Sequence, residues 1–134
     1  MVNLTKNTIV LDTNVILRFL IGDIPEMSIT AADIIANRVC TTPIEVIAEV
    51  VYNLEKYYGY TRELVSEKIK NFILLKEDLV MESNVVRFAC NLYAGTKLDF
   101  VDCLLDGYAK IKGNPVFTFD GGLKKQLGIK AFNS

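Results

Sequence analysis

Two aspartates stand where a short apolar strand is expected to end. Asp12 follows the β-branched residues 7–11 in the string VLDTNV, and Asp120 follows residues 115–119 in VFTFDGG. Taken alone, Asp12 suits a helix N-cap and Asp120 suits a tight turn. In an open parallel sheet, ligands bind where the carboxyl ends of the strands meet. Two such strands in one sheet would release both carboxylates at the same edge.

Two glutamates share the polar face of one expected helix. Glu45 and Glu49 lie about one turn apart, on the side that also carries Asn53 and Lys56. Glu45 ends the tetrad TPIE, which predicts a capping box with proline at the first helical position. Glu49 has no such structural role, and alone it is typical of a solvated surface acid. Periodicity therefore leaves open which glutamate serves chemistry.

A third group of acids recurs along one expected helix face. Asp99, Asp102 and Asp106 are spaced at i, i+3 and i+7 in LDFVDCLLD, and Asp99 is a natural N-cap. Helices that connect parallel strands bring such acids toward the sheet edge of Asp12 and Asp120. Two carboxylates about 4 Å apart repel by roughly 4 kcal/mol at an effective dielectric of 20. Uptake of a proton or binding of a cation removes that cost.

The chemistry open to these acids is narrow because the chain contains no histidine. Ser-His-Asp catalysis, Cys-His catalysis and histidine-ligated zinc are thereby excluded. Ligation by oxygen alone suits Mg²⁺ or Mn²⁺, which are commonly completed by water and substrate phosphate. Such ions stabilise the attacking and leaving oxygens of a phosphoryl displacement. Hydrolysis of a phosphodiester is the reaction that this set of acids favours.

The composition sets further limits on function. At 134 residues, 51% hydrophobic and 23% charged, the chain is expected to form one soluble domain over residues 1–134. Three cysteines without C-x-x-C spacing favour small core residues over disulfides or zinc ligands. No apolar run approaches the roughly 20 residues of a membrane span, and residues 1–6 lack a secretory pattern, so a cytoplasmic location is expected. With a net charge of −1, any binding to nucleic acid must be local or metal-assisted.

Strands and helices are expected to alternate along the whole sequence. Apolar spacing predicts strands at residues 7–11, 39–41, 79–81, 115–119 and 129–132. Helices are predicted at residues 15–20, 25–36, 43–58, 61–75, 83–93, 99–111 and 123–127, with Thr61 as a cap and Gly59 as a stop. Such alternation predicts an α/β fold, with a mostly parallel sheet covered by helices on both faces.

Four blocks of the sequence resemble the acidic blocks of the PIN domains, and among them those of the VapC-like toxin ribonucleases of toxin–antitoxin pairs. The blocks are LDTNVILRFLIGDIPE, TTPIEVIAEVVYNLEKYYG, LDFVDCLLDGYA and VFTFDGGLKK. They follow the family's order at suitable intervals, so the resemblance covers nearly the whole chain. It implies a metal-dependent endoribonuclease whose catalytic and metal-binding residues are Asp12, Glu49, Asp102 and Asp120.

The resemblance also carries finer implications. It selects Glu49 over Glu45 and makes Asp99 an auxiliary metal ligand. Hydrogen-bonding support for the acids is implied at Thr13, Asn14 and Thr118. The implied fold is a three-layer α/β/α arrangement around five parallel strands in the order 3-2-1-4-5, and the implied assembly is a homodimer inhibited by an antitoxin. The two glycines after Asp120 depart from the pattern, since many relatives have a polar or basic residue there.

Two other functions fit parts of the pattern. A phosphatase of the haloacid dehalogenase type also begins with an aspartate after a strand, but it needs a second aspartate where this chain has Asn14. A PIN-like module that binds RNA or protein without cutting would leave its acidic cluster unused, which only destabilises a fold. Metal-dependent cleavage of RNA is therefore the favoured function.

Four basic side chains are expected at the rim of the acidic site. They are Arg18, Lys97, Lys124 and Lys125. Contacts with RNA phosphates are one role for them, and solubility alone is the other. The sequence leaves both roles open.

Overall fold

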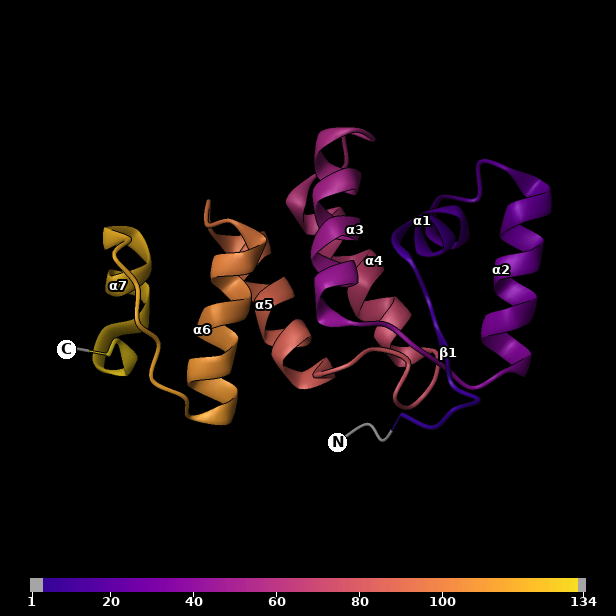
Figure 1. The fold of residues 1–134 in the computed structure, drawn as a ribbon. Helices are drawn as coiled ribbons and strands as arrows, with labels where there is room; N and C mark the ends of the chain where they lie inside the picture. Colours follow the sequence, from indigo (N-terminus) through magenta and orange to yellow (C-terminus); the bar gives the residue numbers. More distant parts are fainter. Residues whose placement is uncertain (1–3, 133–134) are drawn as a thin grey trace.

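Helices make up most of the computed structural model, which describes residues 4–132. In chain order the elements are β1 (Ile9–Val10), α1 (Thr13–Ile21), α2 (Pro25–Asn37), β2 (Cys40–Thr41), α3 (Ile44–Lys56), α4 (Arg62–Leu74), α5 (Ser83–Gly95), α6 (Phe100–Lys112), α7 (Gly121–Leu127) and the 3₁₀ helix η1 (Gly128–Lys130). Figure 1 shows α1 and α2 at one end of the molecule, α6 and α7 at the other, and α3, α4 and α5 between them. None of the helices in residues 4–132 has the length and apolar character needed to cross a membrane.

The first two strands pair in parallel. Ile9 lies opposite Cys40 and Val10 opposite Thr41, and the chain passes through α1 and α2 between the two strands. This helical crossover between parallel strands confirms the α/β class predicted from the sequence. Within residues 4–132 the regular sheet has two strands, so the predicted five-stranded sheet is seen only in part.

Two isolated parallel bridges mark the positions of the other expected strands. Thr42 pairs with Val80, and Val116 pairs with Ala131. The expected third strand thus lies beside the second, and the fourth beside the fifth. The prediction of a strand over residues 129–132 was wrong in its extent, because Gly128–Lys130 form η1. Gly128 adopts a positive φ of 60°, which ends α7 and turns the chain before the bridge at Ala131.

Two helix starts follow the expected capping chemistry, whereas the capping box of α3 is not formed and the Asp99 side chain makes no cap hydrogen bond to α6. The Asp12 carboxylate accepts a hydrogen bond from the Val15 amide at 3.0 Å, and the Thr61 hydroxyl accepts one from the Leu64 amide at 3.1 Å. The capping box predicted at residues 42–45 was wrong, because α3 begins at Ile44 after an N-cap at Pro43 with no side-chain bond.

The physical reason lies in the pairing of Thr42. Its carbonyl oxygen accepts a hydrogen bond from the Met81 amide at 2.9 Å, which keeps its backbone in the strand bridge. Its hydroxyl is buried without a hydrogen-bond partner within the described part of the chain. Glu45 therefore has no capping role, and the choice of Glu49 rests on the family resemblance alone.

The main hydrophobic core joins α1, α3, α4, α5 and the start of α6. Its largest side chains with under 2% exposure include Ile16, Ile47, Leu54, Ile69 and Phe72. A smaller cluster lies between α6 and α7. At the crossing of α5 and α6, a β-carbon on Gly107 would lie 2.9 Å from Val85 Cγ1 and 3.1 Å from the Val85 carbonyl oxygen, so these two helices depend on a glycine for their close approach.

The three cysteines are buried core residues, as predicted. Burial raises the pKa of the Cys90 thiol to about 12 and that of the Cys103 thiol to about 11. Both side chains stay protonated at neutral pH, so neither is poised to act as a nucleophile or a thiolate ligand.

Asp106 is a structural acid within the α6–α7 contact. It is fully buried, its Oδ1 lies 2.6 Å from Lys110 Nζ, and its Oδ2 accepts a hydrogen bond from Gln126 Nε2 at 3.1 Å. The predicted acidic stripe that included Asp106 was therefore wrong. The reason is that α7 packs against this side of α6, so the position faces a neighbouring helix instead of solvent.

Replacing Asp106 with alanine is expected to lower the free energy of unfolding by about 1–3 kcal/mol, because Gln126 and Lys110 lose their buried acceptor. Urea unfolding followed by circular dichroism measures this change. Asp33→Ala serves as the matched control, since Asp33 is an exposed helical aspartate, and it should shift stability by no more than about 0.5 kcal/mol. Equal losses for the two variants would show that the Asp106 network contributes nothing.

Candidate functional site

Three of the candidate acids lie at the starts of α6 and α7. Asp99 is the residue before α6, Asp102 lies in the first turn of α6, and Asp120 is the N-cap of α7. Burial raises the pKa of the Asp102 carboxyl, and the negative charges of Asp120 and Asp99 raise it further. The structure thus places Asp99 and Asp120 within electrostatic reach of Asp102.

Asp120 is held in place by its neighbours in the chain. Its Oδ2 accepts a hydrogen bond from the Leu123 amide at 2.7 Å, and its own amide donates to the Thr118 hydroxyl at 3.0 Å. A β-carbon on Gly122 would lie 3.3 Å from Asp120 Oδ2. The Thr118 hydroxyl therefore fixes the backbone of Asp120, and Gly122 leaves room beside the Asp120 carboxylate. In the sequence this glycine is a departure from the family pattern, and nothing there indicates that it leaves space next to Asp120.

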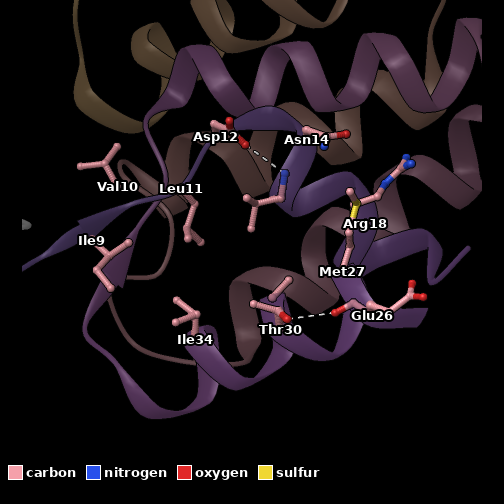
Figure 2. A pocket seen from close by; sticks show the side chains of 12 residues that line it. Ile9, Val10, Leu11, Asp12, Asn14, Arg18, Glu26, Met27, Thr30 and Ile34 are labelled. Carbon is pink, nitrogen blue, oxygen red and sulfur yellow. Dashed lines mark hydrogen bonds between the residues drawn. The ribbon is translucent and has the colours of Figure 1, made fainter. Parts of the chain in front are cut away.

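Asp12 lies at the rim of an apolar hollow formed by β1, α1 and α2 (Figure 2). The hollow has a volume of about 660 Å³, and side chains such as Ile9, Leu11 and Ile34 line it. Asp12 is exposed and uses one carboxylate oxygen to cap α1. Asn14 is exposed at the same rim, while Thr13 is half-buried at the start of α1. The lining of this hollow therefore offers mainly apolar contacts and few polar groups to a ligand.

Glu49 is an exposed residue in the middle of α3. Its backbone carbonyl accepts a hydrogen bond from Asn53 Nδ2 at 2.8 Å. Neither Glu49 nor Asp12 is among the charges that perturb Asp102. Within residues 4–132, no group of three or more carboxylates or thiols lies close enough to hold a metal ion. The structure therefore places Asp99 and Asp120 near Asp102 without forming a three-residue metal cluster, and it shows no such interaction for Asp12 or Glu49.

The side chains of Asp99, Asp102 and Asp120 carry the donor atoms that a divalent cation prefers. All their side-chain donors are carboxylate oxygens, which are hard ligands of the kind that Mg²⁺ and Mn²⁺ prefer. The raised pKa of Asp102 shows that its negative charge is opposed by burial and by its acidic neighbours. A cation among these residues would relieve that opposition.

The candidate basic residues fall into two kinds. Arg18 is buried, its Nη1 lies 3.3 Å from Asp23 Oδ2, and its Nη2 donates to the Tyr58 hydroxyl at 2.6 Å. Its charge is thus used inside the fold. Lys97, Lys124 and Lys125 are exposed, and the last two lie on α7 directly after Asp120. Their positions leave them accessible to an anionic ligand.

Asp120→Asn is expected to raise the free energy of unfolding at neutral pH by up to about 0.5 kcal/mol in chelator, because asparagine keeps the cap and removes one like charge. The folded pKa of Asp102 lies above its unfolded value, so the contribution of Asp102 favours folding in acid and is lost as pH rises through the folded pKa. The gain should therefore vanish in acid.

Urea unfolding across pH and carboxyl NMR titration of Asp102 measure the two effects. Asp33→Asn is the control, as an exposed aspartate on another helix, and it should leave the Asp102 pKa unchanged. An unaltered Asp102 pKa in Asp120→Asn would show that the two acids do not interact.

Comparison with known proteins covers nearly the whole chain. The sequence model of the PIN domain family matches residues 9–126. A VapC ribonuclease of Aquifex aeolicus (strain VF5) is 32% identical over 131 residues, which is 92% of this chain and 94% of that protein. No solved structure matches the chain significantly. The matched region includes every candidate acid. The chain therefore belongs to the PIN domain family, and it is a VapC-like member of that family.

Proposed function

We propose that this protein is a divalent-metal-dependent endoribonuclease and the toxin of a toxin–antitoxin pair. Its membership of the PIN domain family and its similarity to a VapC ribonuclease support a nuclease that cuts RNA. The observation that carries the proposal is the burial of the Asp102 carboxyl near the negative charges of Asp120 and Asp99, which together raise its pKa at two helix starts. Such an arrangement is costly without a cation and useful with one.

In this proposal, Mg²⁺ or Mn²⁺ is held by Asp102, Asp120 and Asp99, with Asp12 and Glu49 completing the acidic site. When bound, the ion stabilises negative charge on the attacking and leaving oxygens of the phosphodiester. The protein itself orients the carboxylates that would bind the ion. The Leu123 amide and the Thr118 hydroxyl fix Asp120, and the Val15 amide fixes the carboxylate of Asp12.

Completion of the site requires the fourth strand to pair along β1, as the order 3-2-1-4-5 implies. The amides of Ile9 and Leu11 both donate toward the β2 side, so Val10 presents its N–H and carbonyl at the opposite edge. Val116 bonds on the Ala131 side, to Lys130 and Phe132, so Phe117 likewise presents a free edge. Pairing of these two edges supplies the five-stranded sheet of a three-layer fold.

Exposed apolar surface at both edges supports this pairing. Val10 is 54% exposed, Phe117 54% and Phe119 87%. Burial of a large apolar side chain contributes about 1.5–3 kcal/mol. Pairing of the two strand edges is therefore favoured by several kcal/mol, before the conformational entropy lost on ordering the strands is subtracted. Because Asp12 and Asp120 both follow these strands, the same pairing would bring the two carboxylates together.

Amide hydrogen exchange tests whether the fourth strand pairs with β1. If the two edges pair, the Val10 and Phe117 amides are expected to exchange at least about a hundredfold more slowly than the exposed amide of Lys6. The Ile9 amide, bonded to Val39 at 2.8 Å, serves as the internal standard for a protected position. Exchange of Val10 and Phe117 as fast as Lys6, with Mg²⁺ present, would exclude the pairing.

The proposed site predicts which acids cleavage needs. With Mg²⁺ or Mn²⁺, Asp12→Asn and Glu49→Gln are each expected to lower the rate of RNA cleavage by about a hundredfold or more, because each removes a ligand charge. Gel assays on structured RNAs measure the rate. Glu45→Gln is the matched control, since it lies on the same helix one turn before Glu49 and should cut like the unaltered protein.

The same assay examines the exposed lysines. Joint replacement of Lys97, Lys124 and Lys125 by glutamine is expected to flatten the salt dependence of cleavage, if these side chains contact phosphate. Arg18 should contribute least to the salt dependence, since its guanidinium already pairs with Asp23 and donates to Tyr58. Cleavage at an equal rate by Asp12→Asn would remove the acidic site from the mechanism. Failure to cut any RNA with either metal would favour a binding module without catalysis.

We further propose a cytoplasmic homodimer that an antitoxin inhibits. Similarity to a VapC ribonuclease is what supports this proposal. Sedimentation analysis of the purified protein tests the dimer, and a monomer at micromolar concentration would exclude it. A small neighbouring reading frame whose product blocks cleavage would identify the antitoxin.

A further inference from the structure

A second hollow lies beside the candidate acids, between α3 and α6. Its volume is about 590 Å³. Tyr52 and Lys56 line it from α3, Asp99 and Val101 line it from the start of α6, and the buried ring of Tyr93 lies at its base. The hollow therefore opens directly next to one of the acids that gather at α6.

The α3 wall of this hollow is continuous with the proposed catalytic face. Glu49, Tyr52, Asn53 and Lys56 follow one another at i, i+3, i+4 and i+7, so they share one side of the helix. One helical turn rises about 5.4 Å. A polynucleotide with a phosphate at Glu49 would therefore extend over Tyr52 and Lys56 if it followed the helix toward its C-terminus.

Tyr52 offers an aromatic surface to a ligand. Its side chain is 52% exposed, and the ring packs edge-to-face against Tyr57, with centroids 6.0 Å apart. Lys56 Nζ lies over the Tyr52 ring, 5.4 Å from its centroid. An exposed aromatic ring and a nearby cation are the two kinds of group that bind the base and the phosphate of an unpaired nucleotide.

Charges of both signs line the hollow: the cations Lys56 and Arg62, and the acids Glu55 and Asp99. Within the described residues, neither Lys56 nor Arg62 forms an ion pair with a carboxylate. The Arg62 guanidinium lies 3.7 Å from the centroid of the Tyr93 ring, and it donates to the carbonyl oxygens of Tyr93 and Leu98. Arg62 is therefore held by the protein itself, whereas Lys56 is exposed beside Tyr52. Lys56 is the cation of the hollow that is accessible to a phosphate.

The apolar hollow of Figure 2 lacks these features. Its lining is dominated by aliphatic side chains, and the cation that borders it, Arg18, is already held by Asp23 and Tyr58. Of the two hollows that border candidate acids, the one between α3 and α6 is thus the better match for a nucleotide.

We propose that the hollow between α3 and α6 binds an unpaired nucleotide of the RNA, next to the phosphate that is cut. The base stacks on Tyr52 and the phosphate contacts Lys56. This inference rests on the ribonuclease function proposed above. Bases inside a duplex are stacked on each other and cannot lie on the tyrosine, so the subsite takes an unpaired base.

Binding without cleavage tests the inference separately from the reaction. A labelled single strand of about 12 nucleotides and the matching duplex are titrated with the full chain in chelator, by fluorescence anisotropy. Tyr52→Leu is expected to weaken binding of the single strand by about tenfold, and Tyr52→Phe to stay within about twofold, because stacking needs the ring and not the hydroxyl. Binding of the duplex should be the same for all three proteins.

Lys56→Gln tests the phosphate contact. It is expected to reduce the slope of log affinity against log salt by about 0.7 for the single strand, which corresponds to one phosphate. Lys68→Gln, on a different helix and outside the hollow, is the control and should keep the slope. Urea unfolding midpoints establish that the variants are folded.

The outcomes separate this inference from the proposed function. Equal binding of the single strand by Tyr52→Leu and Tyr52→Phe overturns the inference, even where the acids prove essential for cleavage. Absence of single-strand binding by the unaltered protein also overturns it. Binding that depends on Tyr52 and Lys56, in a protein that cuts no RNA, would uphold the subsite and reject the ribonuclease.

Discussion

The positive ends of helices carry most of the negative charge of the candidate site. Asp12 and Asp120 cap α1 and α7, Asp99 precedes α6, and Asp102 lies in its first turn. A helix start stabilises a carboxylate by about 0.3–1 kcal/mol, which is similar to the repulsion between neighbouring like charges. The fold can therefore gather acids before any cation arrives. Only Glu49 lies in a helix interior, without such support.

This dependence on helix starts explains how the strands matter to the site. A strand two residues long does little to stabilise a sheet, but it fixes where the following helix begins. β1 places Asp12 at the start of α1, and the bridge at Val116 comes shortly before Asp120. The position of each acid is consequently set by the strand or bridge that precedes it, and the helix follows.

Local chemistry in the sequence predicted what depends on neighbours in the chain. The cap at Thr61, the buried cysteines and the approximate bounds of the helices all follow from short-range patterns. The errors arose where a distant partner decides the outcome. Thr42 was expected to cap a helix, yet its backbone pairs with residues 80 and 81. Asp106 was expected on an acidic surface, yet α7 covers it.

The candidate site shows the same division. The resemblance to a family named the acids, and the structure adds which of them interact: Asp102 with Asp99 and Asp120. Periodicity placed Lys56 on the polar face of α3, but gave no reason to connect it with Tyr52 as a binding surface. That connection requires the hollow formed with α6, which no pattern within one helix can show.

The two capped aspartates have a consequence for the choice of amino acid. In Asp12 and Asp120, a hydrogen bond from a backbone amide fixes the side-chain rotamer. The entropy of ordering these carboxylates is therefore lost during folding, and a ligand that binds later does not have to order them. A glutamate carries the same charge, but its additional methylene moves the oxygens beyond the amide of its own helix. At these two positions, the length of the acid matters as much as its sign.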